Sequence, residues 1–303
     1  MVRTRFRIPG RSDFAFWRTV TSHGWYDLPP FVCDPDRRTL TCSLVTPGGP
    51  PVTCVIREAN AGGISVSAES PSALTPADRR SLRLQIAACL RLDEDFRPFH
   101  RQARSLPEWR WIAASRSGRL LRAPTVFEDA VKMICTTNCT WALTKLMVTR
   151  MVEEYGAPAG DGHRAFPAPE VIAGATEAKL RLRCTMGYRS PFILEMSRRV
   201  ASGELDVEAW RDPAIPEEEL YARMRSVKGI GDYAAGNLLK LCGRYSRLGL
   251  DSWVRQQYAR LHHAGRRVSD RTIERRYREF GEWRGLFFWL EMTRHWHQDK
   301  FPP

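Results

Sequence analysis

The fold of this chain is decided by Val227-Lys228-Gly229-Ile230-Gly231-Asp232-Tyr233-Ala234-Ala235-Gly236-Asn237-Leu238-Leu239. Its Gly-Ile-Gly turn follows an apolar helical segment and leads directly into a helix rich in Ala and Leu, which predicts a helix-hairpin-helix. Glycines leave backbone N–H groups exposed, and the start of a helix carries partial positive charge. We therefore expect the turn to grip a backbone phosphate of a nucleic acid through Lys228, Gly229, Gly231 and Tyr233. A plain connection between two helices is the alternative.

A carboxylate follows this hairpin at the start of the next predicted helix. The segment Leu250-Asp251-Ser252-Trp253-Val254-Arg255 places Asp251 20 positions after Gly231. Asp is a common N-cap residue, so a capping role is the simpler interpretation. A catalytic role is compatible with it, because one oxygen can accept a backbone N–H while the other faces a cleft. The rival carboxylate, Asp232, lies in the first turn of the hairpin's second helix, and we expect a structural role for it.

The charge of the chain favours a polyanionic partner. Lys and Arg number 47 against 34 Asp and Glu, a formal net charge of +13. Solubility and a preference for membrane surfaces are alternative explanations of the charge alone. No stretch approaches transmembrane length, and the basic N-terminus leads into no apolar segment. We therefore expect a cytoplasmic, nucleoid-associated protein that has no membrane partner.

Cysteines and histidines give no pattern of a metal site. The eight cysteines contain no CxxC pair, and several lie in apolar runs, which favours buried free thiols in a reducing compartment. The pairs His262-His263 and His295 with His297 lack a third ligand. We expect no metal.

Two regions differ in their periodicity. Residues 1–100 contain a short helical segment within 12–24, then β-branched runs at 39–45, 52–56 and 64–67 separated by Gly and Pro, and a helix over about 76–92. This order predicts an α+β domain with an antiparallel sheet. Residues 101–303 show no strand pattern and are expected to be helical, with helices after the cap Thr125, over 141–155 and over 282–299.

A polar break at residues 135–140 separates two of these helices. It includes Asn138, which is either the cap of the helix that starts at Trp141 or part of a loop that inserts into a partner. Arg189 and Arg255 are open to two interpretations as well, because each either reaches a phosphate or braces the fold.

Taken together, these motifs resemble the helix-hairpin-helix (HhH-GPD) DNA glycosylase superfamily. The resemblance rests on the hairpin, the Asp251 segment, the capped helix with Cys135-Thr136-Thr137-Asn138, and Met186-Gly187-Tyr188-Arg189, which together cover most of residues 124–262. The N-terminal sheet domain resembles that of the 3-methyladenine DNA glycosylase II and 8-oxoguanine glycosylase branches. The resemblance implies a mainly α fold, in which two helical subdomains (101–303) follow the α+β domain (1–100).

The resemblance also implies a chemistry. Such enzymes flip a damaged or modified base out of double-stranded DNA and cleave its N-glycosidic bond, so that an abasic site is left. Asp251 would stabilise the positive charge that develops on the deoxyribose. Asn138 falls where the family places a side chain that probes the duplex. Tyr233 stands where bifunctional members carry a lysine, so a monofunctional enzyme that uses water is expected.

Cofactors and the base pocket are less constrained by the resemblance. No cysteine follows Cys242, which excludes the family's iron–sulfur cluster, and a monovalent cation at the hairpin is the one cofactor that stays open. We expect the protein to act as a monomer. Stacking on an extruded base is assigned to aromatic residues that are equally typical of a helical core: Tyr188, Trp253, Phe287 and Trp289.

Three functions follow as hypotheses. The first is the monofunctional glycosylase. The second is a non-catalytic DNA-binding protein with the same hairpin, and the third is a glycosylase/lyase that uses another lysine. The substrate is open among an alkylated purine, uracil or mismatched thymine, and an oxidised or otherwise modified base, although a cationic alkylated purine would suit an aromatic pocket.

Overall fold

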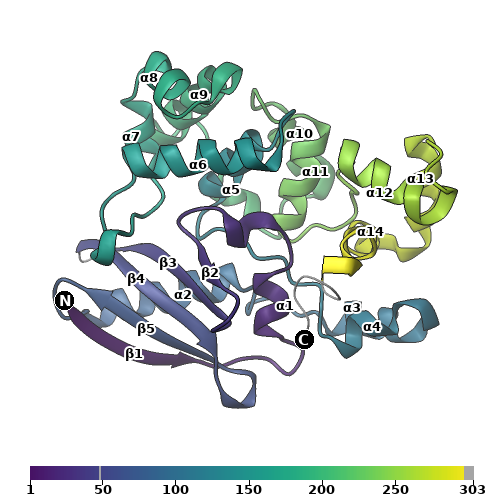
Figure 1. Ribbon diagram of the computed structural model, residues 1–303, viewed down its shortest axis with the longest axis horizontal. Coiled ribbons are helices and arrows are strands. Elements are labelled where there is room, and N and C mark those ends of the chain that lie inside the picture. The colour runs from purple at the N-terminus through teal and green to yellow at the C-terminus, as the bar shows by residue number, and fades with distance from the viewer. Residues whose placement is uncertain (48, 297–303) are drawn as a thin grey trace. The chain divides into compact units, whose positions relative to one another are not determined.

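The structure is a computed structural model that describes residues 1–47 and 49–296 (Figure 1). The chain divides into two compact units, Met1–Val207 and Glu208–Pro303, and each is described by itself. The domain boundary expected near residue 100 lies within the first unit and stays a prediction. No helix in the described part of the chain is long and apolar enough to cross a membrane.

The first unit opens with a five-stranded antiparallel sheet. The strand order is β1-β5-β4-β3-β2, so the first strand of the chain pairs with the last. The strands are β1 (Val2–Ile8), β2 (Val32–Asp34), β3 (Thr39–Thr46), β4 (Gly49–Glu58) and β5 (Ile64–Ser70). The predicted antiparallel sheet is thus confirmed, and each of its three expected strands extends beyond its predicted bounds.

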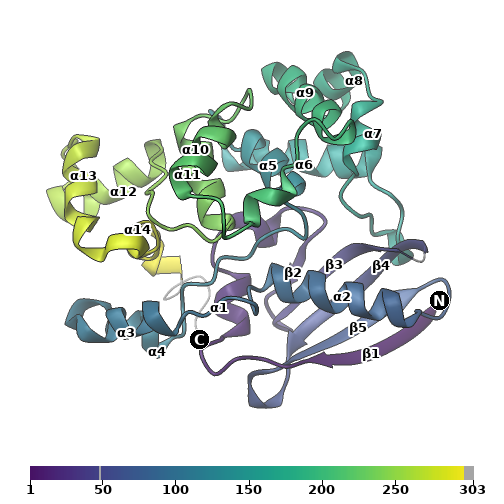
Figure 2. The ribbon, with the colours of Figure 1, turned by 180° about the vertical axis from the view of Figure 1, so that it is seen from behind.

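Alternating apolar residues fix the register of the sheet. Leu40 pairs with Ile56, Ile56 with Val66, and Val66 with Phe6. This row is buried across four strands, and a slip of one residue would turn it to the opposite face of the sheet. Helix α2 (Pro76–Cys89) lies against one face of the sheet, as Figures 1 and 2 show from opposite sides.

The edge strands β1 and β2 were not expected from the sequence. In β1, the basic residues Arg3, Arg5 and Arg7 alternate with Thr4, Phe6 and Ile8. The period is that of a strand, but the charge makes the segment look like a basic tail. Pairing with β5 buries Phe6 and Ile8 and leaves the three arginines exposed, which suits an edge strand.

Among the described residues, the rest of the first unit contains nine α-helices besides short 3-10 helices and loops. Helices α3 and α4 were not expected, whereas α5 and α6 match the helices expected after Thr125 and over 141–155. The set is α1 (Phe16–Val20), α2, α3 (Arg97–Ser105), α4 (Arg110–Ala114), α5 (Val126–Cys135), α6 (Trp141–Tyr155), α7 (Pro169–Ala173), α8 (Glu177–Arg183) and α9 (Ser190–Ala201) among the described residues.

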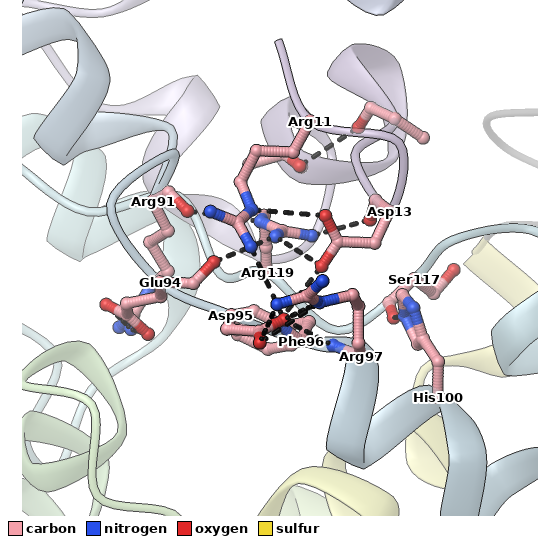
Figure 3. A network of polar contacts seen from close by, with 12 residues as sticks. Arg11, Asp13, Arg91, Glu94, Asp95, Phe96, Arg97, His100, Ser117 and Arg119 are labelled. Atoms are coloured by element: carbon pink, nitrogen blue, oxygen red, sulfur yellow. Dashed lines mark hydrogen bonds and ion pairs between the residues drawn. The ribbon is translucent and has the colours of Figure 1, made fainter.

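A buried ion pair joins three separate segments of this unit (Figure 3). Arg119 donates to the Asp13 carboxylate at 2.9 Å and to the carbonyl oxygens of Arg91 and Glu94 at 3.1 and 3.0 Å. Burial acts to raise the pKa of Asp13, but the hydrogen bond and charge of Arg119 act the other way, and the pKa lies below its usual value. The same carboxylate accepts the Phe96 N–H at 3.0 Å. The pair therefore ties the loop before α1 to the segments on either side of α3 and α4.

The second unit is helical throughout its described part. Its helices are α10 (Glu217–Arg225), α11 (Asp232–Leu241), α12 (Ser252–His263), α13 (Asp270–Tyr277) and α14 (Arg284–Met292). Within the range 282–299 predicted as helical, the structure has α14 over Arg284–Met292. Gly281, with φ 58°, interrupts the helical backbone just before it, and the helix ends at Met292. Residues beyond 296 lie outside the described part.

Candidate functional site

Helices α10 and α11 form the predicted helix-hairpin-helix. Between them, the Ile230 N–H donates to the Val227 carbonyl at 3.1 Å, and Gly229 takes φ 91°, a conformation that a side chain would strain. The first bond of α11 follows at once, from the Ala235 N–H to the Gly231 carbonyl at 2.9 Å. The glycine turn is therefore tight, and it ends where a helix begins.

The start of α11 is open on the side of the turn. Gly231 is exposed, and among described side chains none caps the helix. A Cβ added at Gly231 would meet only Arg225 Nη1, at 3.7 Å, so internal packing does not require glycine there. Lys228 is exposed one residue before the turn. Backbone N–H groups at an uncapped helix start are suited to bind an anion such as a phosphate.

Asp232 has partners within the hairpin. Its Oδ1 accepts a hydrogen bond from the Tyr221 hydroxyl at 2.7 Å and lies 3.1 Å from Arg225 Nε. Tyr221 belongs to α10 and Asp232 to α11, so the carboxylate ties the two helices together across the turn. This arrangement agrees with the structural role expected for it.

Asp251 is the N-cap of α12. Its Oδ1 accepts the Val254 N–H at 2.8 Å, and the side chain is half-buried. Capping therefore engages one carboxylate oxygen and fixes the rotamer, while the second oxygen is not needed by the cap. The geometry is compatible with both roles considered for Asp251 from the sequence, the helix cap and the catalytic carboxylate.

The loop before Asp251 is held by two polar side chains of α11 that the sequence analysis did not select. Lys240 Nζ donates to the Leu248 carbonyl at 2.6 Å, and Asn237 Nδ2 donates to the Gly249 carbonyl at 3.3 Å. Their spacing of three residues on an otherwise apolar helix was the available signal, because such residues lie on one helix face.

The loop that contains Asn138 is exposed and has a defined conformation. Thr140, not Asn138, caps α6, since Thr140 Oγ1 accepts the Leu143 N–H at 3.3 Å. Asn138 takes φ 47°, in the left-handed region, and its Nδ2 donates to the Tyr188 hydroxyl at 3.3 Å. Of the two alternatives for Asn138, the structure therefore excludes the cap.

Tyr188 and Arg189 support this loop from the segment before α9. The Tyr188 hydroxyl lies 3.4 Å from the Thr137 carbonyl, which also accepts a hydrogen bond from the buried Arg189 guanidinium. The guanidinium lies over the Tyr188 ring at 4.5 Å from its centroid. Arg189 therefore braces the fold, whereas the Tyr188 ring is 47% exposed beside Asn138.

Three tryptophans cluster in the second unit. The Trp253 ring lies 6.2 Å from the Trp289 ring and 5.5 Å from the Trp296 ring, and Trp253 is 37% exposed. The sequence analysis did not assign Trp296 to this group. Phe287 lies elsewhere, because its ring is fully buried and stacks on Phe280 at 4.2 Å, as expected of a core residue.

Arg255 lies in an ion pair, and the cysteines and histidines form no metal site among the described residues. Arg255 forms a two-bond ion pair with Asp270, at 2.7 and 2.9 Å, which braces α12 against α13. The eight cysteines are thiols that form no disulfide. Within residues 1–47 and 49–296 no group of three His, Cys, Asp or Glu side chains is placed to hold a metal, and His297 lies outside that range. The monovalent cation at the hairpin stays a prediction.

Solved structures of DNA glycosylases share this architecture over almost its whole length. The 3-methyladenine DNA glycosylase from Archaeoglobus fulgidus matches with a TM-score of 0.77 and 21% identity, over 95% of this chain and 98% of that one. The chain has the helix-hairpin-helix glycosylase fold. The 8-oxoguanine glycosylase/lyase of Clostridium acetobutylicum shares this fold with a TM-score of 0.72 and 16% identity, over 95% of each chain.

A curated relative is similar to the chain in sequence. The probable N-glycosylase/DNA lyase of Methanothermobacter thermautotrophicus is 27% identical over 194 residues. The match covers 56% of this chain and 61% of the relative, so it spans less than two thirds of the relative's length. No family model matches the chain.

Proposed function

We propose that the protein is a monofunctional DNA glycosylase that hydrolyses the N-glycosidic bond of a damaged or modified base in duplex DNA. The observation that carries the proposal is Asp251, a half-buried carboxylate that α12 orients through one oxygen, downstream of an uncapped hairpin helix. The names of the relative and of the similar structures support the coarser class of DNA glycosylase, and two of the three also name a lyase.

The hairpin and the carboxylate would have separate tasks. The N–H groups at the start of α11 would bind a backbone phosphate and hold the strand. The target base would leave the stack, which requires a few kcal/mol of unstacking. As the C1′–N bond breaks, its electron pair goes to the base and positive charge develops on the sugar, where ionised Asp251 would stabilise it. Water would then bond to C1′ and release one proton to the base or to solvent.

Two observations support hydrolysis rather than lyase chemistry. Tyr233, at the position of the family's nucleophilic lysine, has a phenol and no amine, so it cannot form a Schiff base. The nearby amine of Lys240 is 1% exposed and donates to Leu248 and Asn237. Borohydride treatment during turnover should therefore trap no covalent adduct with DNA, and a trapped adduct would contradict the monofunctional assignment.

We assign the duplex-probing role to the exposed Asn138 loop. Its left-handed backbone at Asn138 and the contact with Tyr188 hold the amide at an exposed turn. Tyr188, selected from the sequence for the base pocket, supports this loop instead in our proposal, because its hydroxyl and ring lie beside Asn138 and Thr137.

For the base itself we propose an alkylated, positively charged purine. The partly exposed Trp253 ring, with Trp289 and Trp296 beside it, offers aromatic faces to a cation. A cation over a tryptophan ring gains about 0.5–2 kcal/mol, more as water is excluded. Phe287 is left out of this pocket because its ring is buried in the core.

A panel of single-lesion duplexes tests the function, with abasic sites revealed by alkali. The panel contains alkylated purines, uracil, mismatched thymine and oxidised bases, and we expect release of an alkylated purine. Asp251→Asn should reduce base release by about 100-fold or more while DNA affinity changes little, because Asn keeps the N-cap. Glu274→Gln removes an exposed carboxylate of α13 in the same unit and serves as the matched control.

The outcomes separate the hypotheses. Release of a different base would keep the enzyme class and refute the tryptophan pocket. Full activity of the Asp251→Asn protein would refute the role of Asp251. Salt-dependent DNA binding without an abasic product from any lesion would identify a non-catalytic DNA-binding protein instead.

A further inference from the structure

The loop Leu248–Asp251 is anchored to α11 by buried polar contacts. Lys240 Nζ donates to the Leu248 carbonyl at 2.6 Å and to Asn237 Oδ1 at 3.0 Å. Asn237 Nδ2 donates in turn to the Gly249 carbonyl at 3.3 Å and to the Tyr233 carbonyl at 2.9 Å. Two consecutive carbonyls, two and three residues before Asp251, are thus bound by one pair of side chains.

The backbone of the loop approaches α11 closely at two glycines. Gly249 has φ 65°, and a Cβ there would lie 2.7 Å from Asn237 Nδ2 and 2.9 Å from Lys240 Nζ. A Cβ at Gly236 would lie 3.0 Å from the Gly249 Cα. Both glycines allow α11 and the loop to pack backbone against side chain, which leaves the loop little room to shift.

Burial of the Lys240 amine costs free energy unless the amine is hydrogen-bonded, and here its acceptors include the loop carbonyl of Leu248. Burial lowers the pKa of Lys240 to about 7, while the charge of Asp251 acts to raise it. The amine of Lys240 therefore lies within electrostatic range of the Asp251 carboxylate. The anchor does not depend on the charge, since a neutral amine keeps two N–H groups for its two acceptors.

We propose that Lys240 and Asn237 are positioning residues for base release: they fix the Leu248 and Gly249 carbonyls and thereby the place of the Asp251 carboxylate. The inference rests on the proposed function, because it gives Asp251 the reacting sugar as its target. Neither side chain touches the substrate in this proposal. A carboxylate displaced by about 1 Å from a developing charge loses much of its effect, on the order of 100-fold in rate.

The test compares Lys240→Met and Asn237→Asp with wild type. Met keeps the length of the side chain and removes both donated bonds, whereas Asp keeps an acceptor for Lys240 and removes the donor to Gly249. Lys179→Met, on the exposed face of α8, controls for the loss of one positive charge. Single-turnover base release is measured on the lesion that wild type releases fastest, together with DNA affinity and amide hydrogen exchange over residues 248–254.

We expect base release to fall about 100-fold in Lys240→Met and less in Asn237→Asp, with DNA affinity within about twofold of wild type and faster exchange of the Val254 amide. Unchanged base release, or a parallel loss of affinity and rate, would overturn the positioning role. If Lys240→Met does not fold, Asn237→Asp decides alone. If wild type releases no base at all, the proposed function fails, and amide exchange still decides whether the anchor exists.

Discussion

Replacing Gly249 with Ala tests how tightly the loop before Asp251 is held. The left-handed backbone, with φ 65°, costs an alanine about 1 kcal/mol. The new Cβ would also displace Asn237 Nδ2 and Lys240 Nζ, which lie 2.7 and 2.9 Å away. Four hydrogen bonds depend on these two atoms, and each contributes about 1 kcal/mol. We expect Gly249→Ala to lower the free energy of unfolding by up to about 5 kcal/mol.

Gly265→Ala is the matched control, because Gly265 has φ 81° and a Cβ there would have nothing within 4 Å. It should cost only the backbone part, about 1 kcal/mol. Urea unfolding followed by tryptophan fluorescence measures both values, and base release by the folded proteins tests whether the Asp251 carboxylate has moved. Equal destabilisation by the two substitutions would refute the argument that the contacts with Asn237 and Lys240 fix the loop.

Three further outcomes follow from buried groups. Arg119→Met should cost about 3 kcal/mol in urea unfolding, because it takes the buried guanidinium away from the Asp13 carboxylate and leaves that carboxylate with Arg11, whose Nε lies 3.2 Å away. Adding Asp13→Asn should recover part of the loss, and no recovery would contradict the ion-pair explanation. Asp129→Leu should lower the free energy of unfolding by about 2–4 kcal/mol, because Asp129 Oδ1 accepts hydrogen bonds from Trp25 Nε1 and the Ala123 N–H. Asp129→Asn keeps an acceptor oxygen and should stay within about 1 kcal/mol of wild type. Similar losses of stability in both variants would argue against these hydrogen bonds. The pKa of Lys240 is about 7 in the folded chain against 10.5 in the unfolded chain, so between pH 7 and pH 10.5 the unfolded chain binds one more proton. The free energy of unfolding should therefore rise with pH over this range, by at most about 1.4 kcal/mol per pH unit. The same rise in the Lys240→Met protein would refute the assignment to Lys240.

The hairpin and the cap at Asp251 could be predicted because each is determined by local sequence. Gly229 permits a backbone conformation that few residues adopt, and Asp251 precedes an apolar-periodic helix, so neither inference needed a distant partner. The same holds for α6, whose predicted range of 141–155 agrees with the structure.

Long-range partners account for what the sequence did not show. Strand β1 depends on pairing with β5, more than 50 residues away along the chain, and its arginines conceal the pattern. Helix α3 carries three arginines and α4 has only five residues, so neither shows a sustained apolar repeat. At the candidate site, Lys240 and Asn237 are ordinary polar residues until the loop before Asp251 folds back onto α11. The burial of Phe287 could not be predicted either, since a helical aromatic fits a core as well as a pocket.

Helix α11 begins at the glycine turn and holds the Asp251 loop near its other end, through Lys240. Its length therefore sets the distance between the glycine turn, where a DNA backbone phosphate would bind, and Asp251, where the sugar would react. From Asp232 to Lys240 the helix rises about 12 Å, at about 1.5 Å per residue. One residue inserted within this span would rotate Lys240 by about 100° around the helix axis, away from the Leu248 carbonyl. The length of α11, and not only its composition, would then determine which nucleotide along a bound strand meets the carboxylate.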